Sequence, residues 1–312
     1  MPDIVVMFFL LGLIAGLLRS DLTIPKAAYD TLSLLLMLTI GLKGGMALHG
    51  SLDLSLIFEL LAVAALGGLI PILIIPILYK VLRLDLPNSA SLAAHYGSVS
   101  AGTFAVVIAY VESMNLVTGG QVTLYLVMLE LPAILVSLVI YRKLTNSGDD
   151  STNQQSKFWH ETFTNRGVIL LSGGVIIGWM YGPIQGAAVT ELLTGAFKAV
   201  LALFLLEMGL TAADTLQPIP WKRWRLLIFA VIAPIGLSMI GMAAGMAMSL
   251  PTGSVVVLAT LTASASYIAA PAAIRTAIPQ ADIGLAMLLS LGITFPFNVI
   301  VGIPFYHYLA TL

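Results

Sequence analysis

Residues 95–103 read His95-Tyr96-Gly97-Ser98-Val99-Ser100-Ala101-Gly102-Thr103, a cluster of small and hydroxyl side chains inside a segment that is otherwise apolar. A second cluster of the same kind occupies residues 262–271, which read Thr262-Ala263-Ser264-Ala265-Ser266-Tyr267-Ile268-Ala269-Ala270-Pro271. Glycine lowers helix propensity by about 1 kcal/mol, and proline removes a backbone donor and clashes with the preceding turn. The two clusters therefore predict two helices that are interrupted near their middle.

The composition indicates where these helices lie. Of the 312 residues, 59% are hydrophobic and only 9% are charged, whereas soluble domains carry about 25% charged residues. A surface so poor in charge excludes a soluble enzyme, a nucleic-acid-binding protein and a disordered chain. The absence of cysteine excludes disulfides, thiolate nucleophiles and Cys-ligated zinc. We therefore expect a polytopic protein of the lipid bilayer, in which interrupted backbone occurs only where it lines a protein or water cavity.

The apolar runs divide the chain into ten expected membrane spans, each of roughly the 20 residues that a crossing helix needs. They cover residues 4–19, 27–48, 54–82, 89–111, 121–142, 165–181, 187–212, 223–249, 253–278 and 282–311. One hydrophilic stretch separates five spans from the other five. The expected organisation is a first five-helix repeat at 1–142, a cytoplasmic linker at 143–164 and a second five-helix repeat at 165–312.

The two halves also repeat each other in sequence. Residues 98–100 lie 166 positions before residues 264–266, Gly41 lies 168 positions before Gly209, and Pro132 lies 164 positions before Pro296. Because each repeat has an odd number of spans, the second repeat enters the membrane from the opposite side. The predicted fold is an all-α membrane protein of ten transmembrane helices in two inverted five-helix repeats, with helices 4 and 9 broken. This plan is typical of secondary transporters.

The cations predict the orientation. Of the 14 Lys and Arg residues, all except Lys43 and Lys198 fall in the loops after spans 1, 3, 5, 7 and 9. The positive-inside rule places these loops in the cytoplasm. We therefore expect a multi-pass protein of the bacterial inner (plasma) membrane, with both termini outside.

This orientation places two helix N-termini at the bilayer midplane, where the second halves of spans 4 and 9 are expected to begin near Gly102 and Pro271. Each N-terminus carries roughly half a positive charge and free N–H groups, which suits a small anion. The alternative is that serine and glycine only allow close helix packing. The candidate anion-binding residues are Gly97, Ser98, Ser100, Gly102, Thr103, Ser264, Ser266 and Ala269.

A carboxylate lies at a similar expected depth. Glu130 stands two residues before Pro132 in span 5, and ionisable residues inside the bilayer are functional by default. The structural alternative is a protonated or Lys-paired acid. Thr294 and Asn298 flank Pro296 in the second repeat, and with Ser266 they can supply neutral oxygens to Na⁺. We expect cation coupling at these residues, and no catalytic residue, cofactor or other metal.

In these residues the chain resembles the sodium-dependent bicarbonate transporters of the SbtA type. The similar stretches are residues 40–47, 97–103, 130–133, 263–271 and 275–279. The resemblance implies that the broken helices cross, that core and gate domains form, and that the protein is a homotrimer. It also implies a PII-like regulatory partner, although the chain lacks a long central cytoplasmic insert. Both ion sites are implied to lie at the broken helices.

Two residues differ from the pattern of this family. Tyr267 stands where the family usually has an aspartate after its serine run, and Glu130 stands where it usually has an aspartate. The chain therefore loses a carboxylate at position 267 and keeps one at position 130. Tyr267 joins the expected cation-coupling set of Glu130, Ser266, Thr294 and Asn298.

The resulting functional hypothesis is a secondary active transporter that imports bicarbonate coupled to Na⁺. One alternative is a Na⁺- or H⁺-coupled carrier of another small anion, such as a carboxylate. A second alternative is a membrane sensor that binds its ligand without turnover. No enzyme activity and no nucleic-acid partner are expected.

Overall fold

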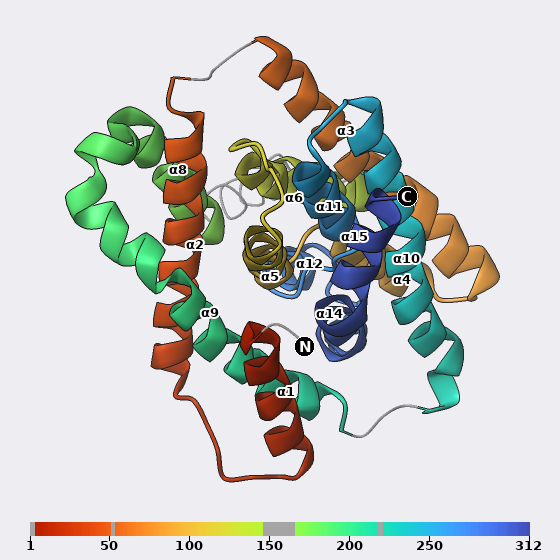
Figure 1. The fold of residues 1–312 in the computed structure, drawn as a ribbon. Helices are drawn as coiled ribbons and strands as arrows, with labels where there is room; N and C mark the ends of the chain where they lie inside the picture. The colour runs from red at the N-terminus through yellow and green to blue at the C-terminus, as the bar shows by residue number, and fades with distance from the viewer. Residues whose placement is uncertain (1–3, 51–53, 146–165, 218–220) are drawn as a thin grey trace.

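The structure is a computed structural model that describes residues 4–50, 54–145, 166–217 and 221–312 (Figure 1). Every regular element within these ranges is a helix, which confirms the predicted all-α class. Most of the expected linker, from residue 146 onward, lies outside the described residues.

The helices of the first half follow the expected spans closely. They are α1 (Ile4–Leu17), α2 (Lys26–Leu48), α3 (Leu54–Pro76), α4 (Leu86–Gly97), α5 (Ala101–Ser113) and α6 (Val122–Leu144). A π-helical turn, Ile77–Val81, continues α3 directly after Pro76. Since proline cannot donate to the helical ladder, it favours such an irregular turn.

The helices of the second half begin after the linker. They are α8 (Arg166–Gln185), α9 (Ala187–Thr215), α10 (Trp224–Ala247), α11 (Thr252–Thr262), α12 (Ala269–Ala277), α13 (Ile283–Met287), α14 (Phe295–Phe297) and α15 (Ile303–Ala310). The last expected span is less regular than predicted, because π-helical stretches at Leu288–Thr294 and Asn298–Gly302 flank α14. Pro296 lies within α14 and explains the widened turns around it.

Seven helical runs are long and apolar enough to cross a membrane by length and composition. They are Lys26–Leu48, Leu54–Val81, Leu86–Ser113, Val122–Leu144, Ala187–Thr215, Trp221–Ala247 and Ile283–Ala310. Three shorter apolar helices, Ile4–Leu17, Ile169–Gln185 and Thr252–Thr262, lie where the remaining expected spans were placed. The protein is thus multi-pass, and the full count of ten spans stays a prediction.

Both predicted helix interruptions are present. The first separates α4 from α5, and its residues Ser98 and Ser100 have extended backbone, with φ of −81° and −100°. The second separates α11 from α12 and covers residues 263–268. The expected start of α12 near Pro271 was two residues late, because the helix begins at Ala269 and Pro271 occupies its third position. The first four N–H groups of a helix have no intrahelical acceptor, so proline is tolerated there.

The helices form two bundles (Figure 1). The small bundle consists of α1, α2, α8 and α9, in which α1 packs along α9 and α2 along α8. The large bundle consists of α3–α6 and α10–α15. Glycines allow the close helix crossings of the small bundle: a Cβ on Gly174 would lie 3.0 Å from the Cα of Gly41, and a side chain on Gly12 would collide with the backbone of Leu206.

Candidate functional site

The two interruptions of the large bundle are hydrogen-bonded to each other. The Ser266 N–H donates to the His95 carbonyl oxygen at 2.7 Å, and the Ser100 N–H donates to Ser264 Oγ at 3.0 Å. Ser264 Oγ in turn donates to the Leu261 carbonyl oxygen at 2.7 Å. The last turn of α4 therefore supplies an acceptor for an N–H group of the second interruption, and the second interruption supplies an acceptor for an N–H group of the first.

Each interruption also caps the helix that follows it. Ser100 is the N-cap of α5, and its Oγ accepts from the Thr103 N–H at 3.0 Å. Ser266 Oγ accepts from the Ala270 N–H of α12 at 3.2 Å. The first N–H groups of a helix have no intrahelical acceptor. Ala101 is the first residue of α5 and Ala269 is the first residue of α12, so their N–H groups are of this kind. Two positive helix ends consequently lie at one place in the structure.

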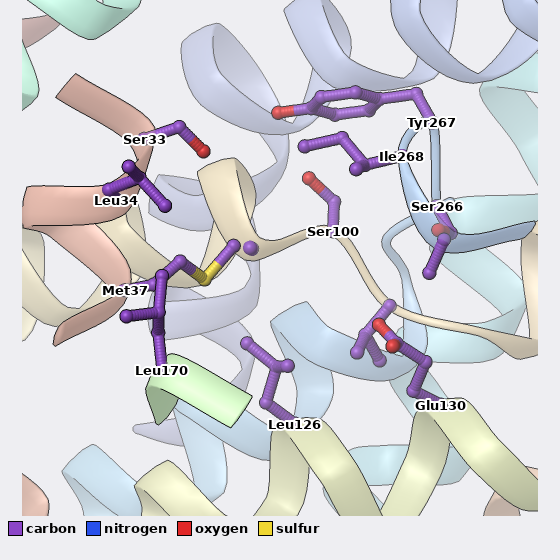
Figure 2. Close-up of a pocket in the computed structure, with 13 residues that line it drawn as sticks. Ser33, Leu34, Met37, Ser100, Leu126, Glu130, Leu170, Ser266, Tyr267 and Ile268 are labelled. Atoms are coloured by element: carbon purple, nitrogen blue, oxygen red, sulfur yellow. The ribbon is translucent and has the colours of Figure 1, made fainter. Parts of the chain in front are cut away.

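A cavity of about 30 Å³ lies against these two helix ends and between the two bundles (Figure 2). Because roughly 10–15 Å³ already holds a water molecule, this volume suits an ion of a few atoms. The residues that line it come from α2, α6, α8, both interruptions and the first residues of α5 and α12: Ser33, Leu34, Met37, Val99, Ser100, Ala101, Leu126, Glu130, Leu170, Ser266, Tyr267, Ile268 and Ala269.

Glu130 is the acidic residue of this cavity. It lies on α6 with 8% of its surface exposed, and Figure 2 shows its carboxylate turned toward the cavity. Within the described ranges, no lysine or arginine pairs with the carboxylate and no group donates a hydrogen bond to it. A buried carboxylate without a partner is costly, so a bound cation or a proton is the natural complement of Glu130.

Tyr267 closes the cavity from the second interruption. Its ring packs edge-to-face on Phe295, with centroids 5.5 Å apart, and its buried hydroxyl lies beside Ser100 and the backbone of Gly102 without a hydrogen bond of regular geometry. The hydroxyl lies directly over Gly102, where any side chain would collide with it. Gly102 is therefore required for the approach of Tyr267 to the N-terminus of α5.

Five of the eight expected anion-binding residues do not line the cavity: Gly97, Ser98, Gly102, Thr103 and Ser264. Gly97 ends α4, and a Cβ there would lie 2.7 Å from Pro71 Cγ and 2.9 Å from Ala133 Cβ. Ser98 and Thr103 are buried, and their hydroxyls have no partner among the described residues. These positions permit tight packing and the turn of the chain, whereas Ser100, Ser266 and Ala269 border the cavity itself.

Thr294 and Asn298 are not brought to the cavity. Thr294 Oγ1 donates to the Ala230 carbonyl oxygen at 2.7 Å, so the Tyr96 hydroxyl donates to it at 2.8 Å. Asn298 Nδ2 donates to the Ala263 carbonyl oxygen, and its Oδ1 accepts from the Tyr306 hydroxyl, both at 2.8 Å. These hydrogen bonds join the two side chains to α4, α10, α15 and the residue after α11, and their expected role in cation coupling stays a prediction.

The sequence did not single out the contribution of the small bundle. Ser33, Leu34 and Met37 reach the cavity from α2, and Leu170 reaches it from α8. Leucine and methionine in an apolar helix look the same whether they face lipid or a cavity. The sequence signal available was that Ser33 is a hydroxyl residue within an apolar membrane segment, and the structure shows that it is buried.

The sequence matches the Na⁺-dependent bicarbonate transporter superfamily over residues 4–311. No curated protein matches the sequence. The resemblance predicted from residues 40–47, 97–103, 130–133 and 263–271 is confirmed, and the family is one of transporters rather than of enzymes. The chain belongs to the Na⁺-dependent bicarbonate transporter superfamily.

Proposed function

We propose that this protein imports bicarbonate by symport with Na⁺, and that both ions bind in the cavity between the two bundles. The observation that carries the proposal is the meeting of two helix N-termini and one unpartnered carboxylate at a single small cavity. The family to which the chain belongs supports the identity of both ions.

The anion is proposed to bind at the starts of α5 and α12. The N–H groups of Ala101 and Ala269 can donate to its oxygens, and the two helix dipoles favour a negative charge. The hydroxyls of Ser100 and Tyr267 border the same space. Bicarbonate has three oxygens and one proton, so it can accept from the N–H groups and donate to a neighbouring oxygen.

Coupling follows from the position of Glu130. An ionised Glu130 without a cation repels an anion in the same cavity, because both charges are negative. Na⁺ bound to the carboxylate, with help from the oxygen of Ser266, removes this repulsion. Each ion then raises the affinity for the other, and this linkage is reciprocal. The H⁺-coupled alternative uses the same residue, since a proton on Glu130 also removes the charge.

The arrangement of the bundles supports alternating access by inverted repeats. The first helix of each half packs on the second helix of the other half, as α1 with α9 and α8 with α2. This reciprocal pairing is expected of a pseudo-twofold axis in the membrane plane. The ten spans, the outward termini, the bacterial inner membrane, the homotrimer and the PII-like partner belong to the same proposal.

Uptake of labelled bicarbonate into proteoliposomes tests the proposal. We expect uptake that requires an inward Na⁺ gradient and is lost when K⁺ replaces Na⁺. Uptake driven by a pH gradient without Na⁺ would instead favour H⁺ coupling through Glu130. Saturable binding without uptake would favour the sensor alternative, and uptake of acetate in place of bicarbonate would favour a carboxylate carrier.

A further inference from the structure

An ion pair joins the two bundles at a distance from the cavity. Lys43 Nζ of α2 bonds to Glu112 Oε1 near the end of α5. The same ammonium lies 4.7 Å from the ring centroid of Phe197 on α9. A single cation therefore contacts two helices besides its own, one of them in the other bundle.

Other polar side-chain contacts in this part of the molecule stay within one bundle. The Tyr110 hydroxyl bonds to His307 Nδ1 at 2.9 Å and joins α5 to α15 in the large bundle. His49 Nδ1 bonds to the Trp179 carbonyl oxygen at 2.6 Å and joins α2 to α8 in the small bundle. The Lys43–Glu112 pair differs from both because a relative movement of the bundles must break it.

The pair lies at one end of the space between the bundles. Lys43 follows Met37, a cavity residue, by six positions, which is about 9 Å along α2. Glu112 follows Ala101 by eleven positions, which is roughly 16 Å along α5. Both helices lead away from the cavity in this direction, so the pair closes the end toward which α5 points.

The position of α9 that corresponds to Lys43 is built differently. At the offset that relates Gly41 to Gly209, Lys43 corresponds to the uncharged Thr211. Thr211 lines a cavity of about 960 Å³ together with Arg19, Glu207 and Asp214, and this cavity lies against α1 and α9 of the small bundle. The Thr211 hydroxyl donates to Glu207 at 3.4 Å, within α9 itself. The Lys43 position thus carries a charged bond between the bundles, whereas the corresponding position of α9 has no such bond and faces a cavity of the small bundle.

We propose that Lys43 and Glu112 form a latch that holds the α5 end of the space between the two bundles closed. Phe197 keeps the ammonium in place by stacking on it. Opening of the latch is required for the cavity to reach the side that the proposed orientation places outside. The inference rests on the proposed alternating access of the cavity, and it does not depend on which anion is carried.

The test uses the fact that the chain has no cysteine. Met37→Cys introduces a single thiol at the cavity, and a membrane-impermeant maleimide applied to intact cells measures access from outside. We expect slow labelling in this background. Lys43→Gln or Glu112→Gln should speed it about fivefold, the size expected for loss of one partly exposed pair with its ring contact.

Charge exchange separates the latch from a general loss of structure. Lys43→Glu and Glu112→Lys should each speed labelling, whereas the double exchange should return it toward the Met37→Cys background. Lys43→Arg keeps the charge and should label slowly. His307→Phe is the matched control, because it removes a polar contact of the same helix without touching the link between the bundles, and it should leave labelling unchanged.

Two results would overturn the proposal: unchanged labelling in both neutral variants, or a double exchange that labels as fast as the single exchanges. The measurement needs neither bicarbonate nor Na⁺. A chain that shows the expected labelling pattern and carries no bicarbonate would contradict the proposed cargo and leave the latch supported. A chain that carries bicarbonate with the latch variants labelled like the background would do the reverse.

Discussion

The two interruptions resemble each other in sequence and differ in what they build. Residues 98–100 form a short bridge in which Ser100 is both an extended residue and the N-cap of α5. Residues 263–268 form a longer bridge, and α12 begins after Ile268, which provides no side-chain cap. The hydrogen bond from the Ala270 N–H to Ser266 Oγ spans four residues, whereas the one from the Thr103 N–H to Ser100 Oγ spans three. The longer segment between Ser266 and Ala270 includes Tyr267.

This difference indicates how a repeated element acquires separate roles. The first interruption creates a well-capped helix end, while the second creates a wall of the cavity and covers that helix end with Tyr267. Glu130 belongs to neither interruption but to α6, and it supplies a negative charge beside the two positive helix ends. The following predictions address first what the two interruptions share, and then each of them separately.

The largest effect is expected at Glu130, which faces both interruptions. Glu130→Gln removes the negative charge that makes anion binding depend on a cation. We expect Na⁺ stimulation of bicarbonate uptake to fall by about ten- to a hundredfold, the size of a typical coupling between two sites. Initial uptake rates measured against Na⁺ concentration give the result.

Glu59→Gln is the matched control for this change. Glu59 is also a carboxylate within a membrane helix, but it accepts from the Tyr125 hydroxyl and from Gln121 Nε2, and it does not line the cavity. Its variant should keep the Na⁺ dependence. An equal loss in both variants would mean that Glu130 has no specific role in coupling.

A second large effect is expected where the two interruptions touch. In Gly102→Ala, the new methyl collides with the Tyr267 hydroxyl, and overpacking of this kind costs about 1–3 kcal/mol. We expect roughly tenfold slower uptake from a strain of that size. Adding Tyr267→Phe removes the colliding oxygen and should restore most of the rate.

The comparison for Gly102 is Gly173→Ala on α8, where a Cβ would meet no atom within 4 Å. This variant should transport at the parental rate. Failure of Tyr267→Phe to improve Gly102→Ala would show that the cost comes from the backbone of α5 and not from contact between the interruptions.

An intermediate effect distinguishes the two caps. Ser100→Ala removes a true N-cap and should lower the free energy of unfolding by about 1 kcal/mol. Ser266→Ala removes a longer hydrogen bond, and we expect a loss of about 0.5 kcal/mol. Thermal unfolding of both purified variants in detergent measures the difference, and a larger loss for Ser266→Ala would reverse the assignment of the caps.

The smallest effect is expected for Tyr267→Phe alone. The hydroxyl lies beside Ser100 and the Gly102 backbone but makes no hydrogen bond of regular geometry, so its removal costs little and the ring contact with Phe295 is kept. We expect Na⁺ dependence within about twofold of the parent, since no coupling charge is lost. An effect as large as that of Glu130→Gln would make the hydroxyl a principal ligand of the cation.

The sequence was informative wherever a residue type conflicts with a regular apolar helix. Glycine, proline and clustered serines marked both interruptions, and the carboxylate of Glu130 stood out among apolar neighbours. Backbone breaks and charges are expensive inside a membrane. Of the residues singled out on this ground, Ser100, Ser266, Ala269 and Glu130 line the cavity, and their roles in ion binding stay predictions.

The sequence was uninformative where position depends on packing between distant segments. Thr294 and Asn298 have suitable oxygens, but their hydrogen bonds to Ala230 and Ala263 engage them elsewhere. Met37 and Leu170 reach the cavity only because the small bundle lies against the large one. Nothing local distinguishes a side chain that faces another bundle from one that faces lipid.

Thiol protection tests most directly the central claim that Na⁺ and bicarbonate share one cavity. Ile268→Cys places a single thiol on the cavity wall, and Thr118→Cys, on the exposed loop before α6, is the control. We predict that bicarbonate and Na⁺ together slow the labelling of Ile268→Cys, that neither does so alone, and that Thr118→Cys is unaffected. Equal protection by bicarbonate in K⁺, or no protection by both ions together, would contradict the shared site.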